Sequence, residues 1–280
     1  MIGRLLAERL AVLWGQPVVV QNVPGAAATL GVDRVARAVP DGHVIGLTGD
    51  GAMVVRVSMD PPPPYDPMRD LAPISLLVRT RNLLVVHPSV PATNLAELVA
   101  LAKARPGQLS YAHPGIGFSS HLGMEMLKQA AGLDIVAVPY ANEGTMFADL
   151  LAGRVQVMMG SGAGTVPRVR SGEVRAIAAT SAERLPSLPD IPTIAESGFP
   201  GFEAVAWFGL IAPGRTPPDI VRRIGEDVAA VLAEPATRTR LEDLGLVVVG
   251  STPAAFAASI PVEIGRMAEV LRPLGLLRGR

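Results

Sequence analysis

The sequence predicts an α/β protein with two lobes, each built on a mainly parallel sheet. Short apolar strands alternate with helical segments along the chain, as in layered α/β folds. With 280 residues, 49% of them hydrophobic and 18% charged, the chain can form two ordinary domains with real cores. Two apolar stretches, 74–86 and 204–212, are long enough to pass between two sheets. We therefore expect lobe 1 to contain 1–80 plus 207–280, lobe 2 to contain 81–206, and a cleft to separate them.

The first third of the chain opens with an amphipathic helix at 1–14, in which Leu5, Leu6, Leu10, Leu13 and Trp14 fall near one face. Four consecutive prolines at 61–64 exclude both helix and central strand. Asn94 and Glu97 have the spacing of a capping box at the start of a helix. The elements predicted in this part are strands at 18–20 and 44–48 and helices at 26–38 and 95–104.

The remainder of the chain repeats the strand and helix alternation. A proline-rich segment at 185–200 is expected to cross the molecule in an extended conformation. The predicted strands are 109–112, 135–138, 155–159 and 174–180, and the predicted helices are 119–130, 144–151, 218–233, 236–244 and 253–271.

Composition excludes several classes of function. A formal net charge of zero gives no general attraction to nucleic acid or to an anionic membrane. The absence of cysteine removes thiol catalysis, disulfides and cysteine-ligated metals. The four histidines, at 43, 87, 113 and 121, are scattered, so we expect no metal site and no cofactor. No stretch is long and apolar enough for a transmembrane helix.

The most informative segment is 109–122, where a short strand leads through a turn with Gly115 and Gly117 into a helix that opens with Ser119 and Ser120. The first amides of a helix lack internal partners and carry the positive end of its dipole, which suits an anion. Turns expected at the carboxyl ends of other strands share this uncharged composition of Gly, Ser, Thr, Asn and Tyr. An anion is therefore expected to be held by backbone amides and hydroxyls, including the rigid donor Tyr140, rather than by a salt bridge.

The chain resembles the solute-binding receptors of tripartite tricarboxylate transporters, often called Bug receptors. Nine matching pieces occur in family order across nearly the whole chain, at 22–31, 38–42, 65–74, 102–107, 115–121, 138–140, 149–153, 188–198 and 207–213. The resemblance implies a periplasmic, two-lobed type II binding fold that captures a small carboxylate without catalysis. It further implies a monomer that delivers its ligand to membrane permease subunits or to a sensor kinase.

The resemblance also implies ligand residues. It places Asn22, Gly25 and Ala26 on one ligand loop of lobe 1, and Thr48 and Gly49 on the neighbouring loop. In lobe 2 it implies a carboxylate-gripping turn, with a tyrosine and a serine nearby: Gly115, Gly117, Phe118, Ser119, Ser120 and His121, then Tyr140 and Ser161. His121 is expected either to contact the ligand or to pack locally.

Two residues depart from the family pattern. Phe118 stands where Ser or Thr is usual, and Asn142 where Gly is usual. The bulk of Phe118 argues against the usual small dicarboxylate and favours an aromatic or longer monocarboxylate. Ser119 or Ser120 is then expected to cap the helix in its place.

The start of the chain also differs from the family pattern. Family receptors begin with a signal peptide and a strand before the helix that matches 3–14, whereas this sequence starts at that helix. The expectation is that a signal peptide and the first strand are missing. The causes considered are a misassigned start, a trimmed fragment and a true receptor with an incomplete sheet, and the first is favoured.

The sequence disfavours two other classes of function. A hydrolase is disfavoured because Gly117-Phe-Ser-Ser-His121 does not complete a Gly-x-Ser-x-Gly nucleophile elbow. A small-molecule-sensing module of a transcription regulator would need a DNA-binding partner domain, and the sequence contains no helix-turn-helix or basic patch.

Overall fold

The computed structural model describes residues 1–23, 25 and 28–278, and it divides the chain into two compact units. Unit 1 is Met1–Arg79 with Ala206–Arg280, and unit 2 is Thr80–Val205. Each boundary lies one residue from the one expected. The chain passes between the units at 79–80 and again at 205–206.

Unit 1 is built on a four-stranded sheet with the order β1-β8-β2-β9. Its strands are β1 Gly46–Gly49, β2 Leu71–Thr80, β8 Trp207–Pro213 and β9 Leu246–Val248. Its helices are α1 Ile2–Trp14, α2 Thr29–Ala36, α7 Pro218–Ala233, α8 Pro235–Asp243 and α9 Pro253–Leu271, with short helical turns η2 Gly51–Val55 and η3 Arg56–Ser58.

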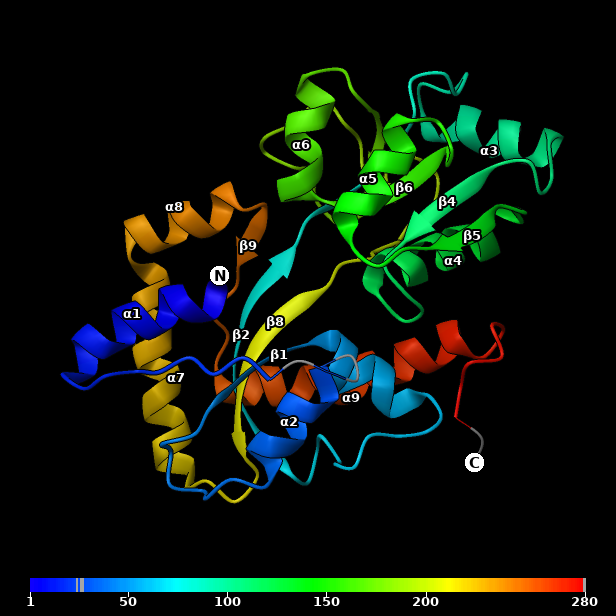
Figure 1. Ribbon diagram of the computed structural model, residues 1–280. Coiled ribbons are helices and arrows are strands. Elements are labelled where there is room, and N and C mark those ends of the chain that lie inside the picture. The colour runs from blue at the N-terminus through cyan, green and yellow to red at the C-terminus, as the bar shows by residue number, and fades with distance from the viewer. Residues whose placement is uncertain (24, 26–27, 279–280) are drawn as a thin grey trace. The chain divides into compact units, whose positions relative to one another are not determined.

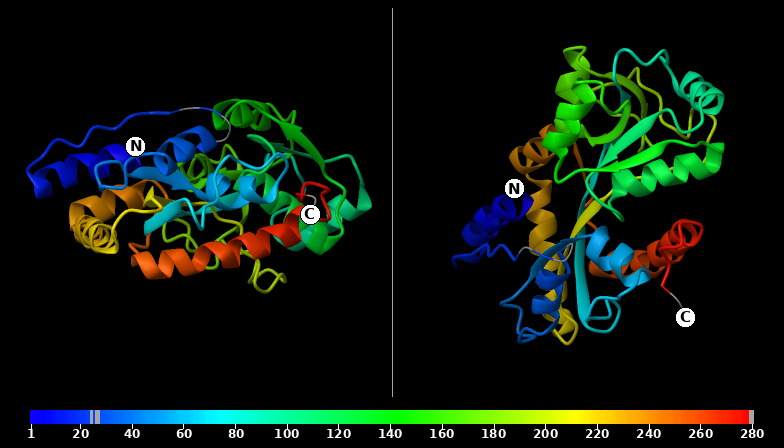
Figure 2. Two further views of the ribbon diagram at one scale, coloured as in Figure 1. Left: turned by 90° about the horizontal axis from the view of Figure 1, so that it is seen from below. Right: turned by 45° about the vertical axis from the view of Figure 1, so that its right-hand side comes forward.

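Helices cover both faces of this sheet. On one face, Leu6 and Leu10 of α1 and Val228 of α7 pack with Ile74 of β2. Helix α1 lies beside α7 in both Figures 1 and 2, and Trp14 Nε1 donates to Asp227 at 2.7 Å. On the other face, a second cluster joins α2, η2 and α9 to β8, with Phe256 at right angles to Trp207. Apolar burial of these faces is the main stabilising term.

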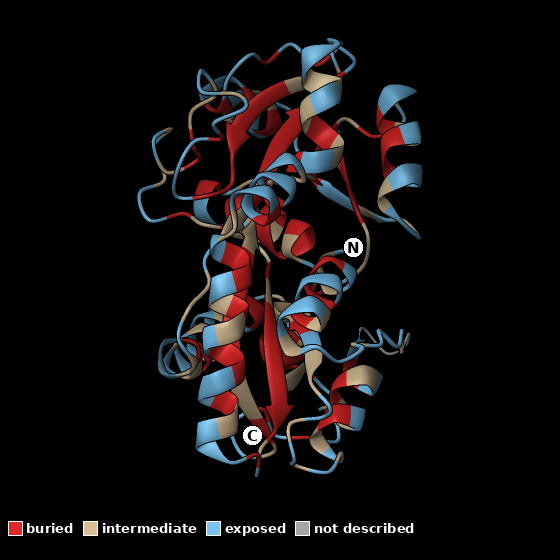
Figure 3. Cartoon of the chain, turned by 90° about the vertical axis from the view of Figure 1, so that its left-hand side faces the viewer, coloured by how far each residue is buried: buried red, intermediate tan, exposed pale blue. Residues whose placement is uncertain are grey.

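Unit 2 is built on a five-stranded sheet with the order β5-β4-β6-β3-β7. Its strands are β3 Asn82–Val86, β4 Ser110–His113, β5 Val136–Pro139, β6 Val157–Ser161 and β7 Arg175–Ala179. Its helices are α3 Leu95–Ala104, α4 Ser119–Ala131, α5 Glu143–Leu151 and α6 Gly162–Arg170. Figure 3 shows the resulting burial: strands are largely buried, and helices are buried along one side only.

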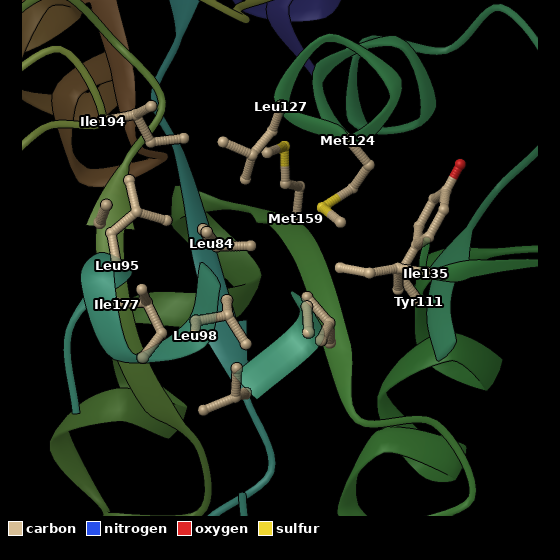
Figure 4. Close-up of a cluster of buried hydrophobic side chains, with 14 of the residues drawn as sticks. Leu84, Leu95, Leu98, Tyr111, Met124, Leu127, Ile135, Met159, Ile177 and Ile194 are labelled. Atoms are coloured by element: carbon tan, nitrogen blue, oxygen red, sulfur yellow. The ribbon is translucent and has the colours of Figure 1, made fainter. Parts of the chain in front are cut away.

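The main core of unit 2 lies where α3 and α4 cover the sheet (Figure 4). Its fully buried members include Leu84, Leu98, Met124, Leu127 and Met159. Tyr111 also lies in this cluster, and its hydroxyl points out of the apolar group and donates to Glu125 at 2.7 Å. The opposite face of the sheet is covered by α5, through Met146, Phe147 and Leu150.

The expectation of mainly parallel sheets needs correction. Strand β4 is parallel to β5 and β6, but β3 is antiparallel to β6 and β7, and β8 is antiparallel to β1 and β2. The cause is the double passage between units. Strand β2 runs out of unit 1 and β8 runs back into it, so these neighbours have opposite directions.

Two local predictions also differ from the structure. No strand forms at 18–20; these residues are extended coil, and the side chain of Val19 is 80% exposed. An apolar segment becomes a strand only where a neighbour supplies its hydrogen bonds. Helix α6 was not predicted, because Gly162, Gly164 and Pro167 are typical of breaks in a helix.

Candidate ligand-binding site

The carboxyl ends of three strands meet at one edge of the sheet in unit 2. Strand β4 pairs in parallel with β5 and β6, so all three end on the same side (Figure 1). All eight residues predicted for lobe 2 lie at these strand ends, in the turns that follow or at the start of α4: Gly115, Gly117, Phe118, Ser119, Ser120, His121, Tyr140 and Ser161. The topology therefore brings these residues to a common edge, where ligands of α/β proteins bind.

The turn after β4 presents the open N-terminus of α4. Gly115 and Gly117 have φ angles of 138° and 88°, which favour glycine, and Phe118 is the N-cap residue. Its side chain cannot accept a hydrogen bond, and α4 has no side-chain cap. The expected capping by Ser119 or Ser120 is wrong, because both residues lie inside the first helical turn. Among the described residues, no acidic or acceptor side chain caps the positive end of the α4 dipole.

Two buried histidines accept hydrogen bonds from the backbone of this turn. His113 Nδ1 accepts from the Gly115 N–H at 3.2 Å, and His121 Nδ1 accepts from the Gly117 N–H at 3.5 Å. The imidazole centroids lie 4.6 Å apart. Burial lowers the pKa of both rings, and burial together with the neighbouring His113 lowers that of His121 to about 4. Both rings are therefore neutral near pH 7, with the proton on Nε2.

These contacts refine the predicted roles. The amides of Gly115 and Gly117 are engaged by histidine, so the first-turn amides at Ser119 and Ser120 are the better anion donors. His121 packs against His113 beneath the turn. Sequence reasoning missed His113. Its position at the end of a strand, two residues after Tyr111 and two before Gly115, is the signal that could have found it.

The rim of the turn is apolar. The side chains of Ile116 and Phe118 are 60% and 50% exposed. A Cβ at Gly115 would lie 3.3 Å from the Phe118 ring, so the ring folds back over the glycine. Phe118 therefore adds apolar surface where a hydroxyl was the family expectation.

Tyr140, at the end of β5, has its hydroxyl engaged within the unit. It donates to Asp149 Oδ2 at 2.8 Å, and Asp149 also pairs with Arg154 at 2.7 Å. Burial, with the hydrogen bond to Asp149, raises the pKa of Tyr140. Its hydroxyl proton is directed to α5, which leaves the ring as the surface a ligand can contact.

Ser161 caps α6 and contacts an acidic residue that sequence reasoning missed. Its Oγ accepts from the Gly164 N–H at 3.3 Å. Its own N–H and Oγ–H donate to the two carboxylate oxygens of Glu143, at 2.8 and 3.0 Å. Glu143 opens α5 directly after Asn142, one of the two departures from the family pattern. An acid within a turn of otherwise uncharged residues is the signal that could have found it.

The residues predicted for lobe 1 lie in unit 1. Asn22 and Gly25 are exposed and lie outside helices and strands, and Ala26 falls outside the described residues. Thr48 and Gly49 end β1, as predicted for a loop at a strand terminus. Thr48 is buried, and its Oγ1 has no hydrogen-bond partner among the described residues. A Cβ at Gly49 would lie 3.0 Å from the Trp207 carbonyl oxygen, so only glycine fits there without strain.

An acidic residue, Asp50, directly follows this loop, contrary to the expectation of few charges, and it feels the negative charge of Glu263 on α9. Burial and the negative charge of Glu263 raise the pKa of Asp50 to about 7, while the Gly51 and Trp207 amides oppose the shift. Trp207 Nε1 donates to Glu263, and Arg79 Nη2 lies 3.9 Å from Glu263. Asp50 directly follows Thr48-Gly49 in the sequence, which is the signal that could have found it.

The described residues contain no helix with the length and apolar character needed to cross a membrane. They also contain no group of three or more potential metal-ligating His, Cys, Asp or Glu side chains.

Two α/β units joined by a double passage, with turns at strand ends and an open helix N-terminus, define a solute-binding protein of the periplasmic type. Comparison with known proteins identifies the family of the chain. Residues 2–276 match the family model described as tripartite tricarboxylate transporter family receptor. The chain belongs to this receptor family.

Relatives and solved structures agree. Protein BugT of Bordetella pertussis is 34% identical over 275 residues, which are 98% of this chain and 84% of BugT. R. palustris Rpa4515, solved with adipate, superposes with a TM-score of 0.87 at 34% identity over 99% of this chain and 93% of that one. MatC from Rhodopseudomonas palustris, solved with bound malate, superposes with a TM-score of 0.82 at 34% identity, over 96% of this chain and 93% of MatC.

Proposed function

We propose that this protein is an extracytoplasmic receptor that captures a small carboxylate for a tripartite tricarboxylate-type transporter. The observation that carries the proposal is the uncapped N-terminus of α4 beside a glycine turn held by neutral histidines. Backbone amides at such an end bind a carboxylate without a formal cation. Adipate and malate, named with two related structures, belong to this ligand class.

The proposed mechanism is closure of two lobes around the ligand. Unit 2 supplies the carboxylate-binding turn at Gly115–His121 and the ring of Tyr140, and unit 1 supplies Asn22, Gly25, Thr48 and Gly49. Contacts that form only in the closed state shift the population toward it. No group on this path needs to form or break a covalent bond, so we propose binding without catalysis.

The proposed setting is the periplasm. There a monomer of this receptor would deliver its ligand to the permease subunits of the transporter, or to a sensor kinase, and it would need no cofactor. Nucleic acid is not a proposed partner, because the net charge is zero.

A thermal-shift screen with small carboxylates tests the proposal. A ligand at 100 times its Kd should stabilise the protein by about 2.7 kcal/mol, which raises Tm by several degrees. Failure of every carboxylate to raise Tm, and to give heat in calorimetry, would contradict the proposal.

Ser119 offers a sharper test of the amide donor, because it is the first residue of α4. Ser119→Pro deletes its N–H at a helix position that tolerates proline. Affinity for the carboxylate should fall by about tenfold or more, because a hydrogen bond to a charged group is lost. The matched variant Ser119→Ala keeps the N–H and removes only the hydroxyl, so it should bind nearly as well as the unchanged protein. Equal binding by Ser119→Pro would show that the α4 amide does not hold the ligand.

A further inference from the structure

The helix N-termini of α4 and α6 meet the same edge of the sheet in unit 2, but their donors are used differently. Helix α4 follows β4, helix α6 follows β6, and these strands are parallel neighbours. Among the described residues, no side chain caps α4, whereas Ser161 caps α6.

The donors at the start of α6 are satisfied from within the chain. The Ser161 N–H and Oγ–H donate to Glu143, and the Gly162 N–H donates to the Arg81 carbonyl oxygen at 2.7 Å. The Gly164 N–H donates to Ser161 Oγ at 3.3 Å. Glu143 therefore occupies with its own carboxylate the place that a ligand carboxylate would take at this helix end.

Glu143 is placed to act on a ligand as well as on Ser161. Glu143 is only partly buried, so part of the residue remains exposed to solvent at the edge of the sheet that carries the turns. A carboxylate offers about four acceptor positions, and Ser161 uses two of them. Only hydrogen-bond donors can use the remainder, and a second carboxylate brought there would meet a like charge.

We propose that Glu143 determines specificity: it restricts the ligand to a molecule with one carboxylate and a hydrogen-bond donor, hydroxyl or ammonium, at its other end. Dicarboxylates are rejected, in contrast to the related proteins whose structures contain adipate or malate. The proposal rests on the proposed function, because the α4 turn must hold the single carboxylate.

Calorimetric titration with ligands of matched length tests this inference. The six-carbon series is hexanoate, 6-hydroxyhexanoate, 6-aminohexanoate and adipate, and the four-carbon series is butyrate, 4-hydroxybutyrate, 4-aminobutyrate and succinate. In the length series that fits the site, the hydroxy or amino acid should bind at least about tenfold more tightly than the dicarboxylate, a difference of about 1.4 kcal/mol. Whether the hydroxy acid or the amino acid binds more tightly shows whether the preferred donor is neutral or cationic.

The variant Glu143→Gln removes the charge and keeps the size of the side chain. It should raise the affinity for the dicarboxylate by about tenfold or more, because the repulsion between like charges is lost. The preference for the hydroxy or amino acid over the dicarboxylate should therefore become smaller. The control Glu173→Gln makes the same charge change beyond the other end of α6 and should leave the selectivity unchanged. A purely structural role of Glu143 would change the melting temperature but not this ratio.

The outcomes separate the two proposals. A dicarboxylate that binds the unchanged protein as tightly as its hydroxy and amino partners overturns the inference about Glu143 and leaves the receptor function standing. If Glu143→Gln leaves the ratio of the two affinities unchanged, the inference about Glu143 is likewise overturned and the receptor function stands. The comparison on the unchanged protein is decisive even if the variant does not fold. Binding of none of the eight compounds to the unchanged protein or to either variant overturns the inference, and failure of every carboxylate in the thermal-shift screen overturns the proposed function with it.

Discussion

His121 is neutral in the folded protein, and its charge state links the turn before α4 to pH. Its ordinary pKa is 6.5 and burial lowers this to about 4, so the folded state binds a proton less readily than the unfolded state. The stability that depends on the neutral ring is present above pH 6.5 and is lost as the pH falls toward 4.

The variant His121→Asn removes this dependence. Relative to the unchanged protein, its free energy of unfolding should rise as the pH falls from 6.5 to 4, by up to about 3 kcal/mol. Urea unfolding at a series of pH values measures the difference. A difference that stays constant over this range would show that His121 does not titrate as described.

Asp50 should behave in the opposite way. Its pKa is raised from 3.8 to about 7, so the folded state holds the proton more tightly. The stability that depends on the protonated Asp50 carboxyl is therefore fully present below pH 3.8 and is lost as the pH rises through 7. Relative to the unchanged protein, Asp50→Asn should gain stability as the pH rises from 4 to 7, by up to about 4 kcal/mol. A flat difference in the same urea experiment would contradict the burial of this carboxylate beside Glu263.

The candidate site could be predicted in part. The glycine turn and the helix start at Ser119 were found, because their local sequence dictates their conformation. Glu143 and His113 were missed as site residues because their roles come from tertiary contacts. Glu143 meets Ser161, which is 18 residues away, only because α5 and β6 pack together. No local pattern encodes that distance.

Helix α9 packs unusually close to the central strand β8. A Cβ at Gly209 would lie 2.4 Å from the Phe256 ring, which is buried with 1% exposure. Gly209 therefore leaves room for the tip of the Phe256 ring, which packs at right angles to the Trp207 ring.

Gly209→Ala should lower the free energy of unfolding by about 1–3 kcal/mol, because the overpacked ring must move. The matched control Gly265→Ala changes a glycine inside α9 that has open space around it, and it should be neutral or stabilise by up to about 1 kcal/mol. Chemical denaturation of both variants measures the effect. Equal stability of both variants would mean that Phe256 has room to shift.

Elements with local start signals were predicted well. Helices α3, α7 and α9 have the predicted bounds, helped by the Asn94 cap of α3 and the prolines that open the other two. The strand at 18–20 was wrong, because strand formation depends on a partner that sequence periodicity does not show. Helix α6 was missed for the reverse reason: its Ser161 cap and its packing overcome two glycines and a proline.

At the scale of the whole molecule, the proposed function requires the two units to move. Addition of a carboxylate that the protein binds should reduce the radius of gyration measured by X-ray scattering, because closure brings the two lobes together. The Ser119→Pro variant at the same ligand concentration should show a smaller change. An unchanged radius at saturating ligand would argue against closure as the mechanism.

The double passage of the chain sets the mechanical character of such a motion. The two passages leave unit 1 side by side, because Arg79 of β2 and Trp207 of β8 are paired in register. Within unit 2, Asn82 begins β3, and the Ala204 N–H donates to the Thr180 carbonyl oxygen at 2.9 Å. Few torsions remain between these anchored points. Two short antiparallel segments held side by side in this way should bend easily across their common plane and resist sliding within it.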